Sequence, residues 1–516
     1  MSRRKSMPWM RSEWMPWQEW RFTRESWLPN RPWRDLVLLI PQHLFSWSSP
    51  TVRLLPLAQH QGHGQEATGE KAGEGALPAV VTEKGENGVQ APGGRHCEPD
   101  ERAPHASESS SSTLAKGSGY TSEMATAAAK NRPAQDSAHT VVNPMRRLIS
   151  LDVTRGITIA FMILVNNGGN GRYSYSQLEH SAWNGWTLTD LVFPSFLFIA
   201  GISIVFSNEA RQARGESKTL LRLHVLRRAV ILFLLGLAVN GFPLFHLSTL
   251  RIYGVLQRIA ICFLFASLLY LWNSRAWVAA TTAVVALLGY WILMRWVPIP
   301  GIGVPTHSVP LLDPDQNWVA YLDRKLLSGR LYEVVRDPEG LLSDIPAMGT
   351  ILLGVLTGIW LRRSKSLFAK ASGLLAGAIA GLLLGNLWNI WFPINKKLWT
   401  SSYVLFAAGC TLLLLAVCFY AVEIRQWTRG WTFPWLVFGS NAIAAYVFSE
   451  FLAAALSTIE LHDGGKVVNL QQYIYQHWFF PVINPSFGSL LYALTFVLVC
   501  FLPVLWLYRR KIFIKV

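Results

Sequence analysis

Ten apolar runs, each about 20 residues long, follow Met145 and constrain the fold more than any other feature of the chain. A helix needs about 20 apolar residues to cross a bilayer, and in lipid a helix satisfies its own backbone groups. Only 15% of the 516 residues are charged, well below the usual share in soluble domains. We predict an all-α, polytopic integral membrane helix bundle in a lipid bilayer. Its ten expected transmembrane helices are 148–167, 187–207, 225–243, 251–272, 276–296, 341–361, 368–391, 399–421, 433–457 and 487–508.

The distribution of Lys and Arg indicates how these helices are oriented. If the end before the first run lies inside, the inside segments hold 19 Lys and Arg and the outside segments hold 10. Cytoplasmic loops of membrane proteins are enriched in these two residues. We therefore predict an N-in/C-in topology. It places five of the six histidines after Met145 on the extracytoplasmic side: His180, His246, His307, His462 and His477.

Residues 1–144 differ in composition from the rest of the chain. Their Gly, Ala, Ser, Glu and Pro content cannot bury enough apolar surface to fold alone, so we expect a disordered extension or a misassigned start before Met145. Residues 145–516 then form the transmembrane domain. Of the net charge of +16, this domain carries +15 (31 Lys and Arg against 16 Asp and Glu), which fits basic membrane loops and argues against a nucleic-acid partner.

Polar residues cluster where the first run ends and the second begins. Asn166 stands in the polar turn NNGG, and His180 stands before a Trp-rich re-entry into the membrane, ten residues ahead of Asp190. A neutral imidazole can act as a general base or a nucleophile, and a carboxylate can orient it. A solvated loop histidine is the alternative. Within the first run, Asp152 and Arg155 share a helix face and are expected to form an ion pair.

Two arginines and a glutamine open the fourth run. Arg251 and Arg258 are seven residues apart, which on a helix places both guanidinium groups on one face, with Gln257 beside them. Two buried guanidinium groups need an anion. The anion is either a phosphate or carboxylate of a ligand or an internal partner such as Asp152 or Asp190.

Two further polar sets complete the candidates. Asn395, Lys396 and Lys397 form a small cationic turn before the eighth run, where an interfacial anchor is the alternative role. Asn441, Tyr446 and Glu450 lie inside the ninth run, and hydrogen bonds between helices often account for such residues. No motif with metal-ligand spacing occurs, so no metal site is predicted.

Several of these segments resemble one known family. The stretches RLISLDVTRGITIAFMILVNNGG, EHSAWNGWTLTDLVFPSFLFIAG and LRIYGVLQRIAI are similar to the catalytic region of heparan-alpha-glucosaminide N-acetyltransferases. The similarity continues through RDPEGLLSDIPAMGTILLG, FPINKKLWTSSYVLF, FGSNAIAAYV and YRRKIFIKV, and so covers about 145–516 in order.

The resemblance implies an acetyl-CoA-dependent N-acetyltransferase that acts on the amine of a glucosamine-type sugar across an inner or plasma membrane. The family's active-site histidine and asparagine match His180 and Asn166, and Asp190 is expected to assist. Candidate acetyl-CoA contacts are Arg251, Gln257, Arg258, Asn395, Lys396, Lys397 and Asn441. The resemblance also suggests a homodimer. A transporter of amino sugars or their oligomers is the alternative function, because buried Asp and Arg fit that class too.

Overall fold

The computed structural model describes residues 148–514 with the exception of 429 and 481. Residues 1–144 therefore lie outside the described residues, and the expectation for them stays a prediction. The helices are α1 (Ile149–Asn166), α2 (Val192–Gln212), α3 (Lys218–Gly241), α4 (Val255–Trp272), α5 (Ala276–Trp296), α6 (Trp318–Leu326), α7 (Asp344–Arg362), α8 (Leu367–Asn389), α9 (Ser401–Phe419), α10 (Thr432–Ser440), α11 (Ala442–Thr458), α12 (Leu470–Ile474) and α13 (Pro485–Arg509).

The helices follow the apolar runs, and some of them begin at polar caps. The side chains of Ser217, Ser366 and Asn484 accept a backbone N–H at the first turns of α3, α8 and α13. Helix α2 packs along α7, and there a Cβ on Gly201 would stand 2.1 Å from the carbonyl oxygen of Ile351. Small residues allow this close approach of the two backbones. The van der Waals contacts that result stabilise helix pairs in lipid, where the hydrophobic effect does not drive helices together.

The helical class is confirmed, with one local exception. Strands β1 (Glu460–Asp463) and β2 (Lys466–Asn469) pair antiparallel. Their turn is Gly464-Gly465, and both glycines have positive φ, as a two-residue hairpin turn requires.

Fewer described helices are long and apolar enough to cross a membrane than the ten expected spans. Eight described helices are long and apolar enough to cross, or up to nine if α10 and α11 form one span bent by 82°. The predicted span 225–243 falls in α3 but is not among these eight, and the first part of α3 carries Lys218, Arg222, Arg227 and Arg228. The count and the N-in/C-in orientation remain predictions.

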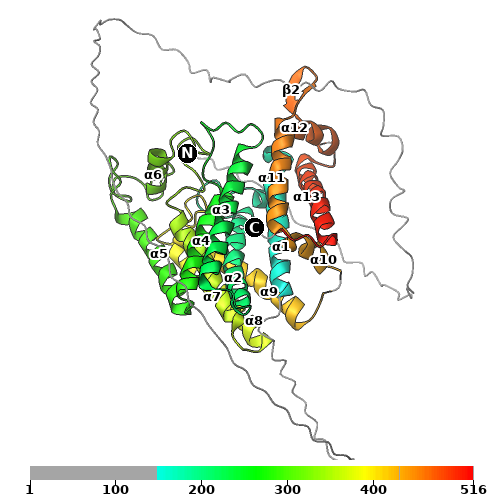
Figure 1. Cartoon of the computed structure of the whole chain (residues 1–516). Coiled ribbons are helices and arrows are strands. Elements are labelled where there is room, and N and C mark those ends of the chain that lie inside the picture. The colour runs from blue at the N-terminus through cyan, green and yellow to red at the C-terminus, as the bar shows by residue number, and fades with distance from the viewer. Residues whose placement is uncertain (1–147, 429, 481, 515–516) are drawn as a thin grey trace, which may run out of the picture. The chain divides into compact units, whose positions relative to one another are not determined.

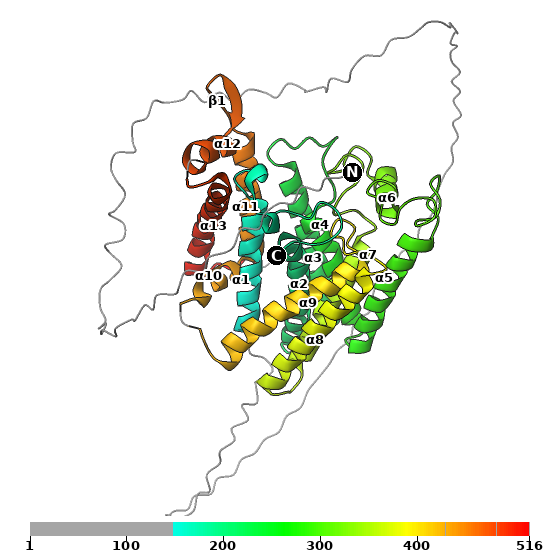
Figure 2. The ribbon, with the colours of Figure 1, turned by 180° about the vertical axis from the view of Figure 1, so that it is seen from behind.

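Three segments predicted to lie outside meet at one end of the bundle, the end that also carries α6, the hairpin and α12 (Figures 1 and 2). The Gly185 N–H donates to the carbonyl of Ile394 at 2.8 Å, and the Trp183 indole donates to the carbonyl of Leu312 at 2.8 Å. The loop 168–186, the loop 297–340 and the turn 392–398 are thereby joined.

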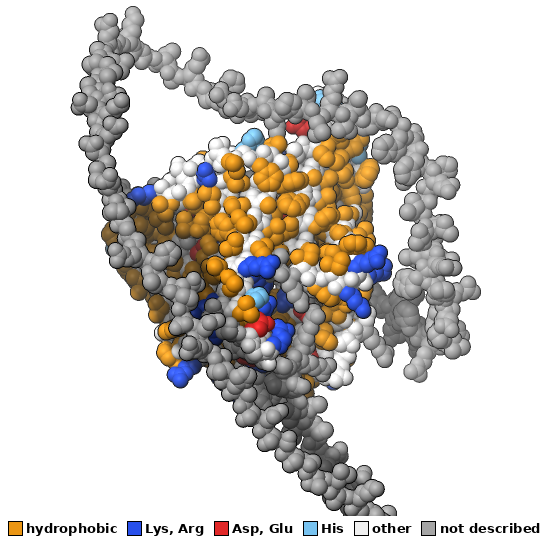
Figure 3. Space-filling model, in the orientation of Figure 1, with side chains coloured by type: hydrophobic (Ala, Val, Ile, Leu, Met, Phe, Trp, Pro, Cys, Tyr) orange, Lys and Arg blue, Asp and Glu red, His pale blue; other side chains and the backbone are white. Residues whose placement is uncertain are grey.

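Peripheral helices turn apolar side chains outward. Leu383 on α8, Val285 on α5 and Leu498 on α13 are each at least 60% exposed. Hydrophobic side chains cover a broad band of the face drawn in Figure 3, whereas most Lys and Arg side chains gather below it. An exposed apolar band of this kind is what a lipid-facing surface requires.

Candidate active site

His180 and Asp190 form a direct pair. His180 Nδ1 lies 2.7 Å from Asp190 Oδ1, and the carboxylate side chain is fully buried whereas the imidazole is 47% exposed. Asp190 Oδ2 also accepts the backbone N–H groups of Ser181 and Thr187, at 3.0 Å each. A carboxylate that receives this many donors acts as an acceptor, so Nδ1 of His180 donates to it, which in a neutral imidazole leaves the lone pair on Nε2.

The backbone of Asp190 is fixed from another helix. The Tyr403 hydroxyl on α9 donates to the carbonyl oxygen of Asp190 at 2.5 Å. Trp183 and Asn184 hydrogen-bond to Leu312 and Asn395 and hold the loop in place. The structure thus orients the imidazole rigidly from one edge and leaves the ring accessible.

Lys396 brings a cation to the imidazole. Its Nζ lies 3.2 Å from Nδ1 and 3.3 Å from Nε2 of His180. Burial lowers the pKa of Lys396, although the carboxylates of Glu339 and Asp190 favour its charge. Its neighbour Asn395 has other partners. The Asn395 amide donates to the side-chain oxygen of Asn184 and accepts the backbone N–H of Leu398.

A cavity of about 580 Å³, here called the histidine cavity, surrounds these groups. Of the predicted site residues, it brings together His180, Asp190, Asn166, Arg251, Lys396 and Lys397. Gln257, Arg258, Asn395 and Asn441 do not line it. Its wall also includes Glu333, Glu339 and Glu450, of which only Glu450 stood out in the sequence.

The prediction that Arg251 and Arg258 share a helix face is wrong. Helix α4 begins at Val255, after an extended Gly254, so Arg251 precedes the helix. Nor is either arginine bound to Asp152 or Asp190. Arg251 binds Asp337 at 2.5 Å and Glu339 at 2.5 Å.

Arg258 is fully buried and binds Asp344 at 2.9 Å across to α7. It also donates to Ser343. Gln257 is buried next to it, away from the cavity. These internal carboxylates are the anions that two buried guanidinium groups need. The predicted contact of either arginine with acetyl-CoA stays a prediction.

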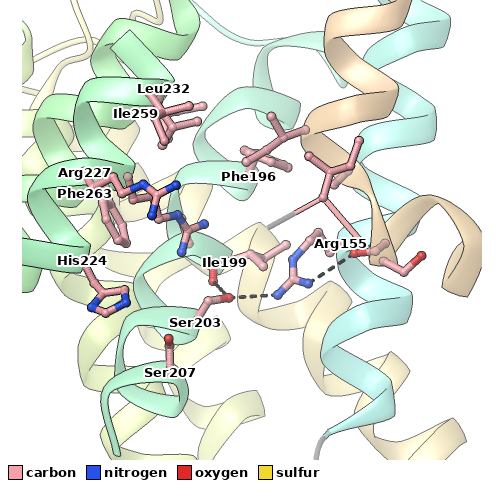
Figure 4. A pocket seen from close by; sticks show the side chains of 18 of the residues that line it. Arg155, Phe196, Ile199, Ser203, Ser207, His224, Arg227, Leu232, Ile259 and Phe263 are labelled. Atoms are coloured by element: carbon pink, nitrogen blue, oxygen red, sulfur yellow. Dashed lines mark hydrogen bonds between the residues drawn. The ribbon is translucent and has the colours of Figure 1, made fainter. Parts of the chain in front are cut away.

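A second cavity of about 440 Å³, the arginine cavity, lies along the same helices (Figure 4). Arg155, Arg211, Arg227, Arg228 and His224 line it, and no described Asp or Glu does. Arg155 reaches Ser203 at 2.9 Å and Gly439 at 3.3 Å, and the expected pair with Asp152 is present at 3.0 Å.

Arg227 and Arg228 in this cavity were missed as site residues, because the sequence showed them only as inside-loop cations. Within the described ranges, no ion pair includes either of them. Asn441 lies at the break between α10 and α11, between two residues that line the arginine cavity, Ser440 and Ala442. There its amide donates to the carbonyl of Ile512 and accepts the N–H of Ile514.

The two cavities are stacked. Helices α1, α2, α3, α4 and α11 contribute to both. On α2, Phe193 lines the histidine cavity and Phe196 the arginine cavity. On α11, the corresponding residues are Tyr446 and Ile443. Roughly one helical turn, about 5 Å, therefore separates the two linings.

A bundle of apolar helices with an oriented histidine on a cavity at one end fits a multi-pass membrane protein with a reactive site. Residues 147–385 match the family model described as "Heparan-alpha-glucosaminide N-acetyltransferase, catalytic". The chain is 30% identical over 359 residues to heparan-alpha-glucosaminide N-acetyltransferase of Homo sapiens, covering 59% of this chain and 53% of that protein. It is 29% identical over 365 residues to the Mus musculus protein of the same name, covering 59% and 54%.

The family resemblance seen in the motifs is confirmed by these matches. The chain spans about half the length of the curated relatives it matches. The relatives are N-acetyltransferases by name, which supports a membrane acetyltransferase.

Proposed function

We propose that this chain is an integral membrane acetyltransferase that moves an acetyl group from acetyl-CoA to the amine of a glucosamine-type sugar. The observation that carries the proposal is the 2.7 Å contact between His180 and the buried Asp190, inside a cavity that also holds Lys396 and Asn166. Amide formation from a thioester needs a base and a donor group for the carbonyl oxygen, and these residues supply both.

His180 has two mechanistic roles open to it. As a general base, Nε2 takes a proton from the attacking amine and returns it to the departing thiolate of CoA. As a nucleophile, Nε2 attacks the thioester carbonyl and expels the CoA thiolate; the amine then attacks the acetyl-imidazole, releases the imidazole and gives its proton to the thiolate. In both cases Asp190 holds the Nδ1–H tautomer. Lys396 and the Asn166 amide are the candidates to stabilise the negative oxygen of the tetrahedral intermediate.

The arginine cavity suits the phosphates of the donor. It presents four arginines from three helices and no described carboxylate, and guanidinium groups bind phosphate in bidentate fashion. On α1, Arg155 lines the arginine cavity and Asn166 lines the histidine cavity. These two residues are eleven positions apart on the helix, which corresponds to about 16 Å along its axis. A donor with phosphates at the arginine cavity and a long uncharged arm could then present its thioester to His180.

The proposed sidedness follows from charge. The basic asymmetry places the arginine cavity on the cytoplasmic side, where acetyl-CoA is made, and the histidine cavity on the extracytoplasmic side of an inner or plasma membrane. The acceptor sugar is then met outside. A homodimer remains a suggestion of the family resemblance alone.

The test is acetyl transfer by the purified full chain. Labelled acetyl-CoA is offered with a panel of amino sugars, and N-acetyl product is measured together with CoA release. Product that depends on both substrates supports the proposal. Uptake of labelled glucosamine into vesicles without CoA would favour the alternative, a transporter of amino sugars, for which two stacked cavities in one ring of helices also provide a path.

A further inference from the structure

Four carboxylates line the histidine cavity, and three of them are neutralised within the protein. Asp190 is bound to His180, and Glu339 is bound to Arg251 at 2.5 Å. Glu333 is held by Lys397 at 2.8 Å and by Arg336 at 2.7 Å. The positive and negative groups of this wall therefore largely cancel.

Glu450 is the fourth carboxylate, and its partners are neutral. It lies on α11 and is partly buried. Its Oε1 accepts the Asn166 amide at 3.4 Å, and the Tyr446 hydroxyl one turn earlier also hydrogen-bonds to it. In the part of the chain that the structure describes, no ion pair includes Glu450.

A carboxylate that faces a cavity from an apolar helix is costly unless a cation joins it. Asn166 and Tyr446 fix the carboxyl group by hydrogen bonds but bring no cation to it. A compact cation that donates hydrogen bonds and enters the cavity from outside the protein would complete this set of contacts.

We propose that Glu450 is the ammonium-binding residue of the acceptor site, where it holds the protonated primary amine of the incoming sugar near His180. This inference rests on the proposed function, since it assigns the acceptor to the same cavity. It also gives Asn166 a positioning role, because the amide that fixes Glu450 belongs to the last residue of α1. A neutral N-acetylated sugar lacks the cation, so the product is released from the same contact.

The experiment uses the full chain in lipid nanodiscs and the variant Glu450→Gln, which keeps the size of the side chain. KM for glucosamine is expected to rise about 10- to 100-fold, the loss typical of one hydrogen bond to a charged group. KM for acetyl-CoA is expected to stay unchanged. Glu460→Gln, an exposed carboxylate of β1, is the matched control. An unchanged KM for glucosamine in Glu450→Gln overturns the inference even while transfer by the wild type upholds the proposed function.

A binding measurement keeps the inference testable if transfer fails. Titration calorimetry of the wild type with glucosamine and with N-acetylglucosamine needs no variant and no turnover. Tighter binding of glucosamine is expected, and Glu450→Gln is expected to remove that preference whereas Glu450→Asp retains part of it. Equal affinity of the wild type for both sugars overturns the inference, whatever the outcome for acetyl transfer.

Discussion

The histidine cavity and the arginine cavity are built from the same five helices but carry opposite chemistry. The histidine cavity is lined by both carboxylates and cations, and its carboxylates are Asp190, Glu333, Glu339 and Glu450. The arginine cavity is lined by arginines and by no described carboxylate. Under the proposed function, the donor's phosphates lie in the arginine cavity and the acceptor's amine lies in the histidine cavity. One set of helices would then hold donor and acceptor apart and still let their reacting ends approach.

The largest expected effect is an all-or-none difference in access from the two sides of the membrane, which decides the side on which each cavity lies. In a chain with Cys97→Ser and Cys410→Ser, Lys466→Cys is expected to react with an impermeant thiol reagent added outside, and Arg363→Cys only after the membrane is opened. Both side chains are exposed. Labelling of position 363 from outside would reverse the orientation and with it the assignment of the two cavities.

The proposed catalytic group, His180, lines one cavity alone. His180→Ala is expected to lower acetyl transfer by about 10²–10⁴-fold, the range that a positioned base contributes. The donor is expected to bind as before, because the arginine cavity is untouched. Initial rates and acetyl-CoA binding by calorimetry check this together. Transfer at the wild-type rate would remove His180 from the mechanism.

Asn166→Ala is expected to cost about 10²–10³-fold if the amide acts as a single oxyanion donor. The split between kcat and KM separates this role from the positioning of Glu450. Loss in kcat with a constant KM for glucosamine indicates the oxyanion role, whereas a rise in that KM indicates the positioning role. Wild-type values for both would contradict any part for Asn166.

The arginine cavity is tested by its unpaired cations. Arg227→Gln and Arg228→Gln are each expected to raise KM for acetyl-CoA about 10- to 100-fold, because each loses a charge-assisted hydrogen bond to phosphate. KM for glucosamine is expected to stay constant. Arg363→Gln, an exposed cation outside both cavities, is the control. If KM for the donor is unchanged in both variants, the phosphates are bound elsewhere.

The sequence predicted what is local and missed what depends on packing. His180 and Asp190 are ten residues apart, so their contact could be anticipated, and apolar length predicted most of the helices. The partner of Arg258 could not be anticipated, because Asp344 is 86 residues away and meets it only through the packing of α4 on α7. The sequence predicted Arg251 to lie on the helix of the fourth run. It lies before α4 because the backbone at Gly254 is extended and the helix begins only at Val255.

Breaks within apolar runs were also invisible. The run 433–457 is long and apolar enough to predict one continuous helix, yet the backbone leaves the helix at Asn441, whose side chain binds the chain near Ile512 and Ile514. That contact joins residues more than 70 positions apart. The sequence carried no signal for it beyond the asparagine itself.

The smallest expected effect concerns the loop that covers the histidine cavity. Burial raises the pKa of Asp323 in α6 to about 6 from an ordinary 3.8, against the N–H groups of Leu341 and Asp337 that favour its charge. The folded state therefore binds the proton more tightly than the unfolded state. The stability that Asp323 contributes is full below about pH 3.8 and is lost as the pH rises through about 6.

The thermal midpoint of the wild type minus that of Asp323→Asn is therefore expected to fall between pH 4 and pH 7 by a few degrees at most. The variant keeps the size of the side chain but does not titrate, so the subtraction removes the pH response of every other group. Glu460→Gln, outside this loop, is expected to give a smaller slope. A difference that rises with pH would mean that the two N–H donors outweigh burial and hold Asp323 charged. The cover of the histidine cavity would then be firmest at neutral pH.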